Sequence, residues 1–423
     1  MKRVGSFLVV VALISAMLGC AVDDPVVILP DAKLEAAIRE ALNKPAGDIH
    51  SSELAGLVSL SASNKRIEDL SGLQYCINLI DLDLSMNIIT DISPLTSLTK
   101  LTELYLYNNP ISNIFPLASL TDLTTVYLGH NHISDVSPLR NLNKLETLSL
   151  QANNISDVSP LASLTNLDFL GLGSNQISDI PSLDSLTNLT ELRLGYNLIS
   201  DISPLAKLSN LTVLDIMDNQ INDISPLASL TNLTDVDLCD NQINDISPLA
   251  NLIKLAALSL RSNEISDISP LAGITNLRSL LLEGNQISDI SPLASLTNLD
   301  FLIFASNQTS DISPLSGLTN LIGLFLDGCN ISDISPLASL TNLEILSLDD
   351  CNISDISPLT SLTNLADLSL MFNQISDISP LVDNLGLGEG DYIDLGFNPL
   401  SEQSVNEYIP QLEARGARVI YDN

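Results

Sequence analysis

Hydrophobic residues recur along this chain with a fixed period of 22 positions. One unit, residues 79–100, reads LIDLDLSMNIITDISPLTSLTK. The leucine that opens the unit returns without a slip at Leu57, Leu79, Leu101, Leu123, Leu145, Leu167, Leu189, Leu211, Leu233, Leu255, Leu277, Leu299, Leu321, Leu343 and Leu365. A degenerate last unit, with Ile393, Leu395 and Asn398, follows a three-residue insertion. These fifteen units and the last one predict sixteen stacked turns of a solenoid, because a period in this range is typical of such arrays.

Positions three to seven of each unit alternate between apolar and variable residues, which predicts a half-buried strand. In the unit that opens at Leu211, we expect Leu214 and Ile216 to point inward and Val213 and Asp215 to point outward. The ninth position is Asn in thirteen of the sixteen turns. An amide side chain both donates and accepts, so we expect it to bond the backbone of its own turn and of the next one.

The second half of the unit predicts a short helical segment. The thirteenth position is usually Asp, which can accept a hydrogen bond from the amide two residues later. We expect Ser at the fifteenth position to cap a helical turn that Pro at the sixteenth position begins. Pro181 and Ser182 invert this order, which predicts an irregular turn there.

Both ends of the array carry segments that fit caps over an otherwise exposed core. Before it, we expect a strand at residues 26–29 and then a helix that Asp31 caps, with an apolar face of Leu34, Ile38, Ala41 and Leu42. A second short helix is expected near residues 52–57. After the array, we expect a flexible insertion at residues 385–392, a helix at 401–408, a second helical turn between Pro410 and Gly416, and a strand at 419–421.

The repeat pattern, with its signature ISDISPLASLTNL, resembles the leucine-rich repeat superfamily and within it the bacterial internalin subfamily. The resemblance covers roughly residues 26–423. It implies an α/β repeat fold: a right-handed, curved solenoid with a parallel β-sheet on the concave face, short 3-10 or helical turns on the convex face, and helical caps at both ends. The resulting division is a signal peptide at 1–20, a tether and N-terminal cap at 21–56, the array at 57–386, and the last repeat with its cap at 387–423. Family members use the concave face to bind partners.

Residues 1–20 are typical of a targeting segment. Lys2 and Arg3 precede an apolar run to Leu18 that is too short and wrongly flanked for a membrane-spanning helix. The Gly19-Cys20 pair resembles the bacterial lipobox, which implies cleavage before Cys20 and a lipid on its thiol. Ala21 then suggests outward sorting. The alternative is an ordinary secretory signal with an incidental cysteine, which would make the protein secreted.

Charge and motifs narrow the classes of function. With 17 basic and 51 acidic residues, the net charge is −34, which disfavours nucleic acid as a partner. The chain has three histidines and no nucleophile, zinc or phosphate-loop motif, so we predict no enzyme activity, no cofactor and no metal. His130 and His132 flank the asparagine column without nearby carboxylates. Cys329 and Cys351 replace that asparagine in adjacent turns, and we favour buried thiols over a disulfide there.

The outward positions, which are the third, fifth, seventh and eighth of each turn, stop repeating, and we expect these concave positions to supply three candidate patches. The candidate binding residues are Tyr105, Tyr107, Tyr127, Phe169, Glu191, Arg193, Asp215, Asp237, Leu281, Phe301, Ile303, Phe325 and Ile345. The tyrosines fit either stacking on a sugar or cross-strand pairing that stabilises the sheet. The paired aspartates fit a basic partner, a bound Ca²⁺ or plain solvation. The Phe and Ile run favours an apolar protein anchor.

These patches leave three functions open. A protein partner on the concave face is the main prediction, a glycan or wall polymer on the tyrosines is the first alternative, and a structural envelope spacer is the second. In each case the membrane is reached only through the N-terminal lipid.

Overall fold

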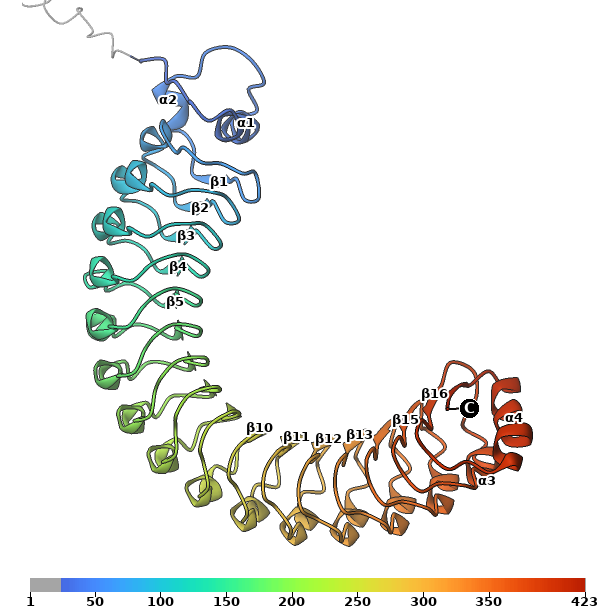
Figure 1. The fold of residues 1–423 in the computed structure, drawn as a ribbon. Helices are drawn as coiled ribbons and strands as arrows, with labels where there is room; N and C mark the ends of the chain where they lie inside the picture. Colours follow the sequence, from blue (N-terminus) through green and yellow to red (C-terminus); the bar gives the residue numbers. More distant parts are fainter. Residues whose placement is uncertain (1–23, 423) are drawn as a thin grey trace, which may run out of the picture.

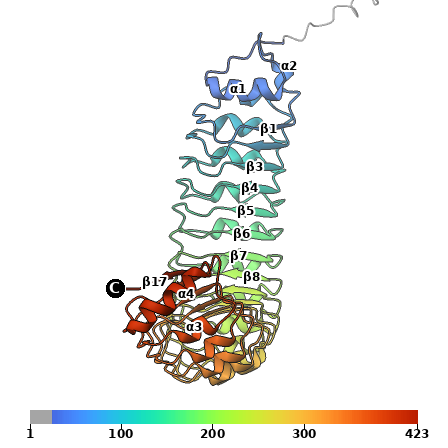
Figure 2. The ribbon, with the colours of Figure 1, turned by 90° about the vertical axis from the view of Figure 1, so that its right-hand side faces the viewer.

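The computed structural model describes residues 24–422 and shows a single curved solenoid (Figure 1). The strands line the inner side of the arc and short helical turns line its outer side, as the repeat predicted. In the perpendicular view, the turns of the N-terminal half stack like rungs (Figure 2). The predicted signal segment and Cys20 lie outside the described residues.

One parallel sheet of 17 strands runs the length of the concave face. Each strand has three residues, and each pairs in register with the next along the chain, so that Leu214 lies beside Val236. The strands are β1 (Ser59–Ser61), β2 (Asp81–Asp83), β3 (Glu103–Tyr105), β4 (Thr125–Tyr127), β5 (Thr147–Ser149), β6 (Phe169–Gly171), β7 (Glu191–Arg193), β8 (Val213–Asp215), β9 (Asp235–Asp237), β10 (Ala257–Ser259), β11 (Ser279–Leu281), β12 (Phe301–Ile303), β13 (Gly323–Phe325), β14 (Ile345–Ser347), β15 (Asp367–Ser369), β16 (Tyr392–Asp394) and β17 (Arg418–Ile420). The sixteen predicted turns account for β1 to β16.

Short 3-10 turns form the convex side. They span Leu73–Tyr75, Ser93–Ser97, Phe115–Ser119, Ser137–Leu139, Ser159–Ser163, Pro181–Ser185, Ser203–Lys207, Ser225–Ser229, Ser247–Asn251, Ser269–Gly273, Ser291–Ser295, Ser313–Gly317, Ser335–Ser339 and Ser357–Ser361, and α3 (Ser379–Asp383) takes the same place in the next turn. The expected Asp bond is present, as where Ser93 N–H donates to Asp91 at 2.8 Å. The expected Ser cap is wrong: Ser93 is the first residue of its turn and its side chain caps nothing.

The inverted pair Pro181-Ser182 changes less than predicted. The 3-10 turn has five residues, as most of the others have. The prediction of an irregular turn is therefore wrong as far as its length is concerned. Proline has no N–H, however, and Asp179 accepts instead from the hydroxyl of Ser178 at 2.8 Å.

A column of asparagines runs through the interior, beside a continuous core of leucine and isoleucine. Asn219 is typical: its Nδ2 donates to Leu194 O at 3.1 Å and to Ile216 O at 3.2 Å, and its Oδ1 accepts from Ile199 N–H at 2.9 Å. The amide therefore bonds its own turn and the preceding turn, where the following one was expected. Within residues 24–422, no buried side-chain nitrogen or oxygen lacks a partner.

The N-terminal cap is helical, as predicted, and differs in detail. Asp31 caps α1 (Ala32–Ala41) by accepting from the N–H groups of Lys33 and Leu34. The buried face of α1 is Leu34, Ala37 and Ile38, whereas the predicted Ala41 is exposed. Helix α2 (Ser51–Leu54) follows. The predicted strand at 26–29 is wrong, because this segment makes only a single antiparallel bridge, between Val26 and His50.

The C-terminal cap forms one continuous helical stretch where two were expected. A π-helical segment at Ser404–Tyr408 leads directly into α4 (Ile409–Ala414), and β17 closes the sheet. The insertion expected to be flexible at 385–392 is packed in part: Leu387 is buried and Gly386 lies against the backbone of Thr363, whereas Leu385 is 84% exposed. The residues just before the insertion are also held in place. Asn384 is buried and its Nδ2 donates to Leu359 O and Leu362 O, while the guanidinium of Arg415 donates to Asn384 O and Val382 O.

Candidate functional site

The concave face is the candidate site. We use this name for the side chains at the third, fifth and seventh positions of each turn, which project from the inner side of the sheet. Register places equal positions of successive turns side by side, so each position forms a column along the arc. These columns bring together the predicted patches.

The tyrosine patch is assembled as predicted. Tyr105 and Tyr127 pair in register, and their rings stack with centroids 5.3 Å apart and planes 14° from parallel. Tyr107 meets His130 edge to face at 4.9 Å. Burial raises the pKa of Tyr105 to about 12, helped by the hydrogen bond from its hydroxyl to Glu103. Each ring covers much of one face of the other, which supports a role for this pair in stabilising the sheet.

The central acidic patch places like charges side by side. Asp215 and Asp237 are in register on β8 and β9. Burial is the main cause that raises the pKa of Asp215, and the charge of Asp237 adds to it. Arg193 is in register with Asp215 but bonds Glu191 at 2.6 Å. Arg193 is therefore paired with Glu191 and not with Asp215, although its charge partly offsets the rise in the pKa of Asp215.

This patch predicts a measurable pH effect. A raised carboxyl pKa means that the folded chain takes up the proton before the unfolded chain does, so stability grows as the pH falls from neutral toward about 4. We expect Asp215→Asn to stabilise the fold at neutral pH by about 0.5 kcal/mol and to reduce this growth. Thermal unfolding followed by circular dichroism over that range tests it.

A convex aspartate supplies a control of opposite sign. Asp201 accepts from Ser203, and this bond lowers the pKa of Asp201, so its contribution is present at neutral pH and is lost on acidification. Asp201→Asn should not stabilise the neutral protein. An unchanged pH profile in Asp215→Asn would contradict the like-charge argument.

An apolar strip crosses β11 to β14. Leu281, Ile303 and Phe325 form one column in register, and Ile345 lies beside Gly323. Phe301, which is 39% exposed, lies over Gly323: a Cβ there would come within 2.5 Å of its ring. The glycine thus lets the ring lie flat on the sheet. The strip is half-exposed and continuous.

Phe169 does not join any patch. Its ring lies against Gly171 of its own strand, where a Cβ would be 3.3 Å from it. In register it lies between Thr147 and Glu191. The structure gives it the role of covering a glycine rather than extending the apolar strip.

The cysteines at the asparagine position are buried, unpaired thiols. Cys329 Sγ lies 3.8 Å from Phe304 O and Cys351 Sγ lies 3.6 Å from Leu326 O, so each contacts a carbonyl that the asparagine amide would bond. Burial raises the pKa of Cys351 to about 12. Cys239 lies at the seventh position of its turn and is also buried, with its thiol 3.3 Å from Asp240.

The eighth position of each turn, which was expected on the concave face, forms a rim where the chain leaves the sheet. This position has a positive φ along the array, for example 55° at His130 and 59° at Tyr196. Two successive turns place aromatic rings there: Phe372 and Phe397 stack at 4.2 Å and are 49% and 57% exposed. The frequent Asn, Asp, Ser and Gly at this position were the signal, since they tolerate positive φ, whereas bulky side chains do so rarely.

A second acidic group near the C-terminal end was missed by the sequence analysis. Burial is the main cause that raises the pKa of Asp349, and the charges of Asp327 and Asp394 add to it. Asp327 accepts from the hydroxyl of Ser347, and Asp349 accepts from that of Ser369 at 2.6 Å. Hydroxyl and backbone donors hold both carboxylates in place.

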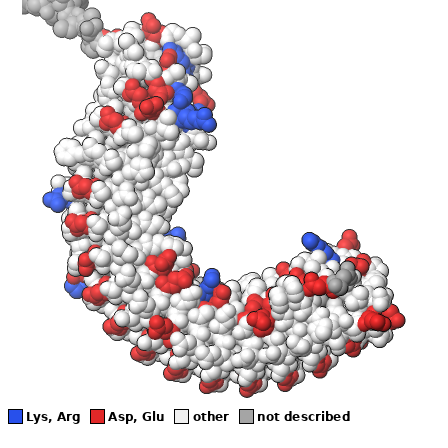
Figure 3. Space-filling view, viewed as in Figure 1, with Lys and Arg blue, Asp and Glu red and all other residues white. Residues whose placement is uncertain are grey.

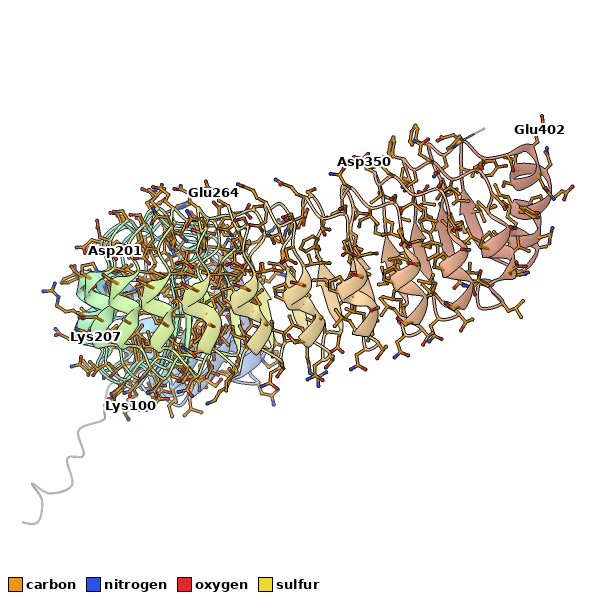
Figure 4. The ribbon with its side chains drawn as sticks, turned by 90° about the horizontal axis from the view of Figure 1, so that it is seen from below. Lys100, Asp201, Lys207, Glu264, Asp350 and Glu402 are labelled. Carbon is orange, nitrogen blue, oxygen red and sulfur yellow. The ribbon has the colours of Figure 1, made fainter. Side chains whose placement is uncertain are left out.

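Charge is also arranged along the edges of the solenoid. Acidic atoms recur at intervals along the outer edge of the arc, and basic ones are few (Figure 3). Seen from below, Glu264, Asp350 and Glu402 lie along one edge, away from Lys100, whereas Asp201 lies nearer to the helical turns (Figure 4). Among the described residues, no three His, Cys, Asp or Glu side chains come together as a metal site would require. None of the helices in residues 24–422 is long and apolar enough to cross a membrane.

Comparison with known proteins agrees with this architecture. The family model "Leucine Rich repeats (2 copies)" matches in overlapping pairs over residues 99–339 and again over 341–383. An internalin (inlF) of Listeria monocytogenes is 40% identical, with a TM-score of 0.74 over 78% of this chain and 96% of that one. This chain is an internalin-like leucine-rich repeat protein.

More distant structures share the fold alone. The functional domain of InlJ from Listeria monocytogenes is 23% identical, with a TM-score of 0.75 over 87% of this chain and 80% of that one. The plant peptide hormone receptor RGFR1, in complex with RGF2, is 20% identical, with a TM-score of 0.70 over 89% of this chain and 68% of that one. A comparison with curated proteins gave no match.

Proposed function

We propose that this internalin-like protein is an exported, non-catalytic binding protein that docks a protein partner on its concave face. The single observation that carries the proposal is the apolar strip of Leu281, Phe301, Ile303, Phe325 and Ile345. Nearly every other feature of the turn repeats, whereas these side chains gather on four successive strands, at positions where several other turns carry serine, glycine or aspartate. Half-exposed apolar groups that are continuous in this way are typical of interaction sites.

Family membership supports the same proposal without naming a partner. The plant peptide hormone receptor RGFR1, which shares this fold, forms a complex with RGF2. Export and lipid anchoring at Cys20 belong to the proposal too, and rest on the residue pattern of the first 20 positions. The glycan alternative loses support because Tyr105 and Tyr127 stack on each other.

The proposal predicts that the double variant Phe301→Ser/Phe325→Ser loses its partner. Serine at either position leaves the buried core intact but removes the anchors, which should weaken binding at least tenfold, since a central anchor contributes about 2 kcal/mol or more. The measurement is capture from the native envelope or a host surface fraction, with wild-type and variant chains compared by quantitative mass spectrometry.

A convex residue supplies the matched control. Phe115 is 72% exposed on the outer side, so Phe115→Ser removes an exposed ring without touching the concave face. Wild type and Phe115→Ser should capture the same protein. Equal capture by the Phe301/Phe325 double variant would overturn the proposal and favour the spacer alternative.

A further inference from the structure

The apolar strip is short and has a defined position on the arc. It runs from β11 to β14, so with strands about 4.8 Å apart it spans roughly 14 Å. Phe301 and Phe325 form its centre, since both rings border Gly323. A single apolar anchor of one or two large side chains covers this length.

Carboxylates lie on both sides of the strip. Toward the N-terminus, β9 presents Asp235 and Asp237, and Asp215 lies beside them on β8. Burial, with the charge of Asp237, raises the pKa of Asp235. Toward the C-terminus, Asp367 is exposed on β15 and Asp349 is half-buried in the turn before it. Asp394 on β16 is buried and accepts hydrogen bonds from the hydroxyl of Tyr392 and from Gly396 N–H, so it adds little to this flank.

The basic groups of the concave face are already engaged. Arg193 bonds Glu191 at 2.6 Å, and Arg261 bonds Glu283 at 2.9 Å. The guanidinium of Arg418 lies 5.5 Å above the ring of Tyr392. Within residues 24–422, no ion pair reaches the aspartates that flank the strip on β8, β9, β15 and β16. Both flanks therefore present uncompensated negative charge.

Resting on the proposed function, we infer that the strip docks a protein segment with an apolar anchor and with lysine or arginine on both sides of it. The rings of Phe301 and Phe325 contact the apolar anchor of the partner. The aspartates on the two sides of the strip pair with the basic residues of the partner. Complementary charge of this kind speeds association and rejects acidic competitors. From β11 to β9 is about 10 Å, which an extended segment covers in about three residues.

A designed peptide tests this directly on the full chain. The probe is Lys-Lys-Ser-Gly-Leu-Phe-Leu-Phe-Gly-Ser-Lys-Lys with a fluorophore, and its partner replaces every Lys by Glu. Fluorescence anisotropy should show binding of the lysine peptide that weakens with added salt, and binding at least tenfold weaker for the glutamate peptide. Phe301→Ser/Phe325→Ser and Asp235→Asn/Asp237→Asn should each weaken the lysine peptide at least threefold. Phe115→Ser and Asp201→Asn, both on the convex side, should leave it unchanged.

Three results would overturn the inference: equal binding of the two peptides, binding that survives both concave variants, or no binding at roughly 1 mM peptide. Its failure is separable from that of the proposed function. If capture from the native fraction still depends on Phe301 and Phe325 while the two peptides do not bind as expected, the concave face is still supported as the docking surface. Only the requirement for basic residues beside the anchor is then contradicted. If capture is independent of both residues, the proposed function itself falls.

Discussion

Replacement of Asn219 by alanine should destabilise the whole array by about 3 kcal/mol, although the residue touches no proposed ligand. Its amide bonds the carbonyls of Leu194 and Ile216 and the N–H of Ile199, all of which are buried between two turns. Alanine leaves these backbone groups without partners, and each such loss costs about 1–3 kcal/mol. Because a solenoid is stabilised through neighbouring turns, the cost appears in the unfolding of both flanking segments. Urea denaturation followed by circular dichroism measures it.

The chain itself supplies the controls for this prediction. Turns thirteen and fourteen hold Cys329 and Cys351 at the same position, with thiols near the carbonyls, so Asn219→Cys should cost clearly less than Asn219→Ala. Asn232 makes two solvent-exposed hydrogen bonds, in which it donates to Ser209 O and accepts from Lys254 Nζ. Asn232→Ala should change the stability by less than about 0.5 kcal/mol. Equal effects of Asn219→Ala and Asn232→Ala would contradict the role assigned to the column.

The fold was predictable because the same local sequence pattern recurs in every turn. A period of 22 residues, a strand alternation and an asparagine column fix both the register and the direction of stacking. If one unit departs from the pattern, the other units still predict the same strand and the same helical turn. The Asp91 to Ser93 bond was predicted for the same reason, since its geometry depends on two residues only.

Features that occur at only one position in the chain, and not in every repeat, were predicted less well. The insertion near Asn384 looked flexible because it is rich in glycine, yet its backbone is packed against the neighbouring turn, which no local pattern reveals. The eighth position was read as an ordinary concave position, whereas its positive φ turns Phe372 and Phe397 outward to the rim.

Prediction of the candidate site was limited for a different reason. Register alone brings Tyr105 to Tyr127 and Asp215 to Asp237, and the sequence predicts both pairs. Whether two neighbouring rings stack on each other or face a ligand depends on side-chain conformation. The same holds for Phe301, whose place over Gly323 follows from the missing side chain on the next strand.

Gly386→Ala should disrupt the C-terminal end of the array, with a loss of about 3 kcal/mol or more. A Cβ at Gly386 would lie 2.0 Å from the carbonyl oxygen of Thr363 and 2.6 Å from its carbonyl carbon and Cα. These are backbone atoms of the preceding turn, so no side chain can move aside to relieve the contact. Gly386 has no positive φ, so the effect is steric and not conformational.

The expected result for Gly386→Ala is a lower unfolding midpoint together with earlier proteolysis near the C-terminal cap. Gly317 is the matched control, because it also has no positive φ and a Cβ there would meet nothing within 4 Å. Gly317→Ala should be neutral or slightly stabilising, since alanine restricts the unfolded chain more than glycine does. Wild-type stability in Gly386→Ala would show that the two turns are less tightly packed than the structure has them. The apolar strip ends at β14, and the contact joins the end of that turn, at Thr363, to Gly386 of the next turn. Binding of the lysine peptide should therefore survive any Gly386→Ala protein that remains folded through β14.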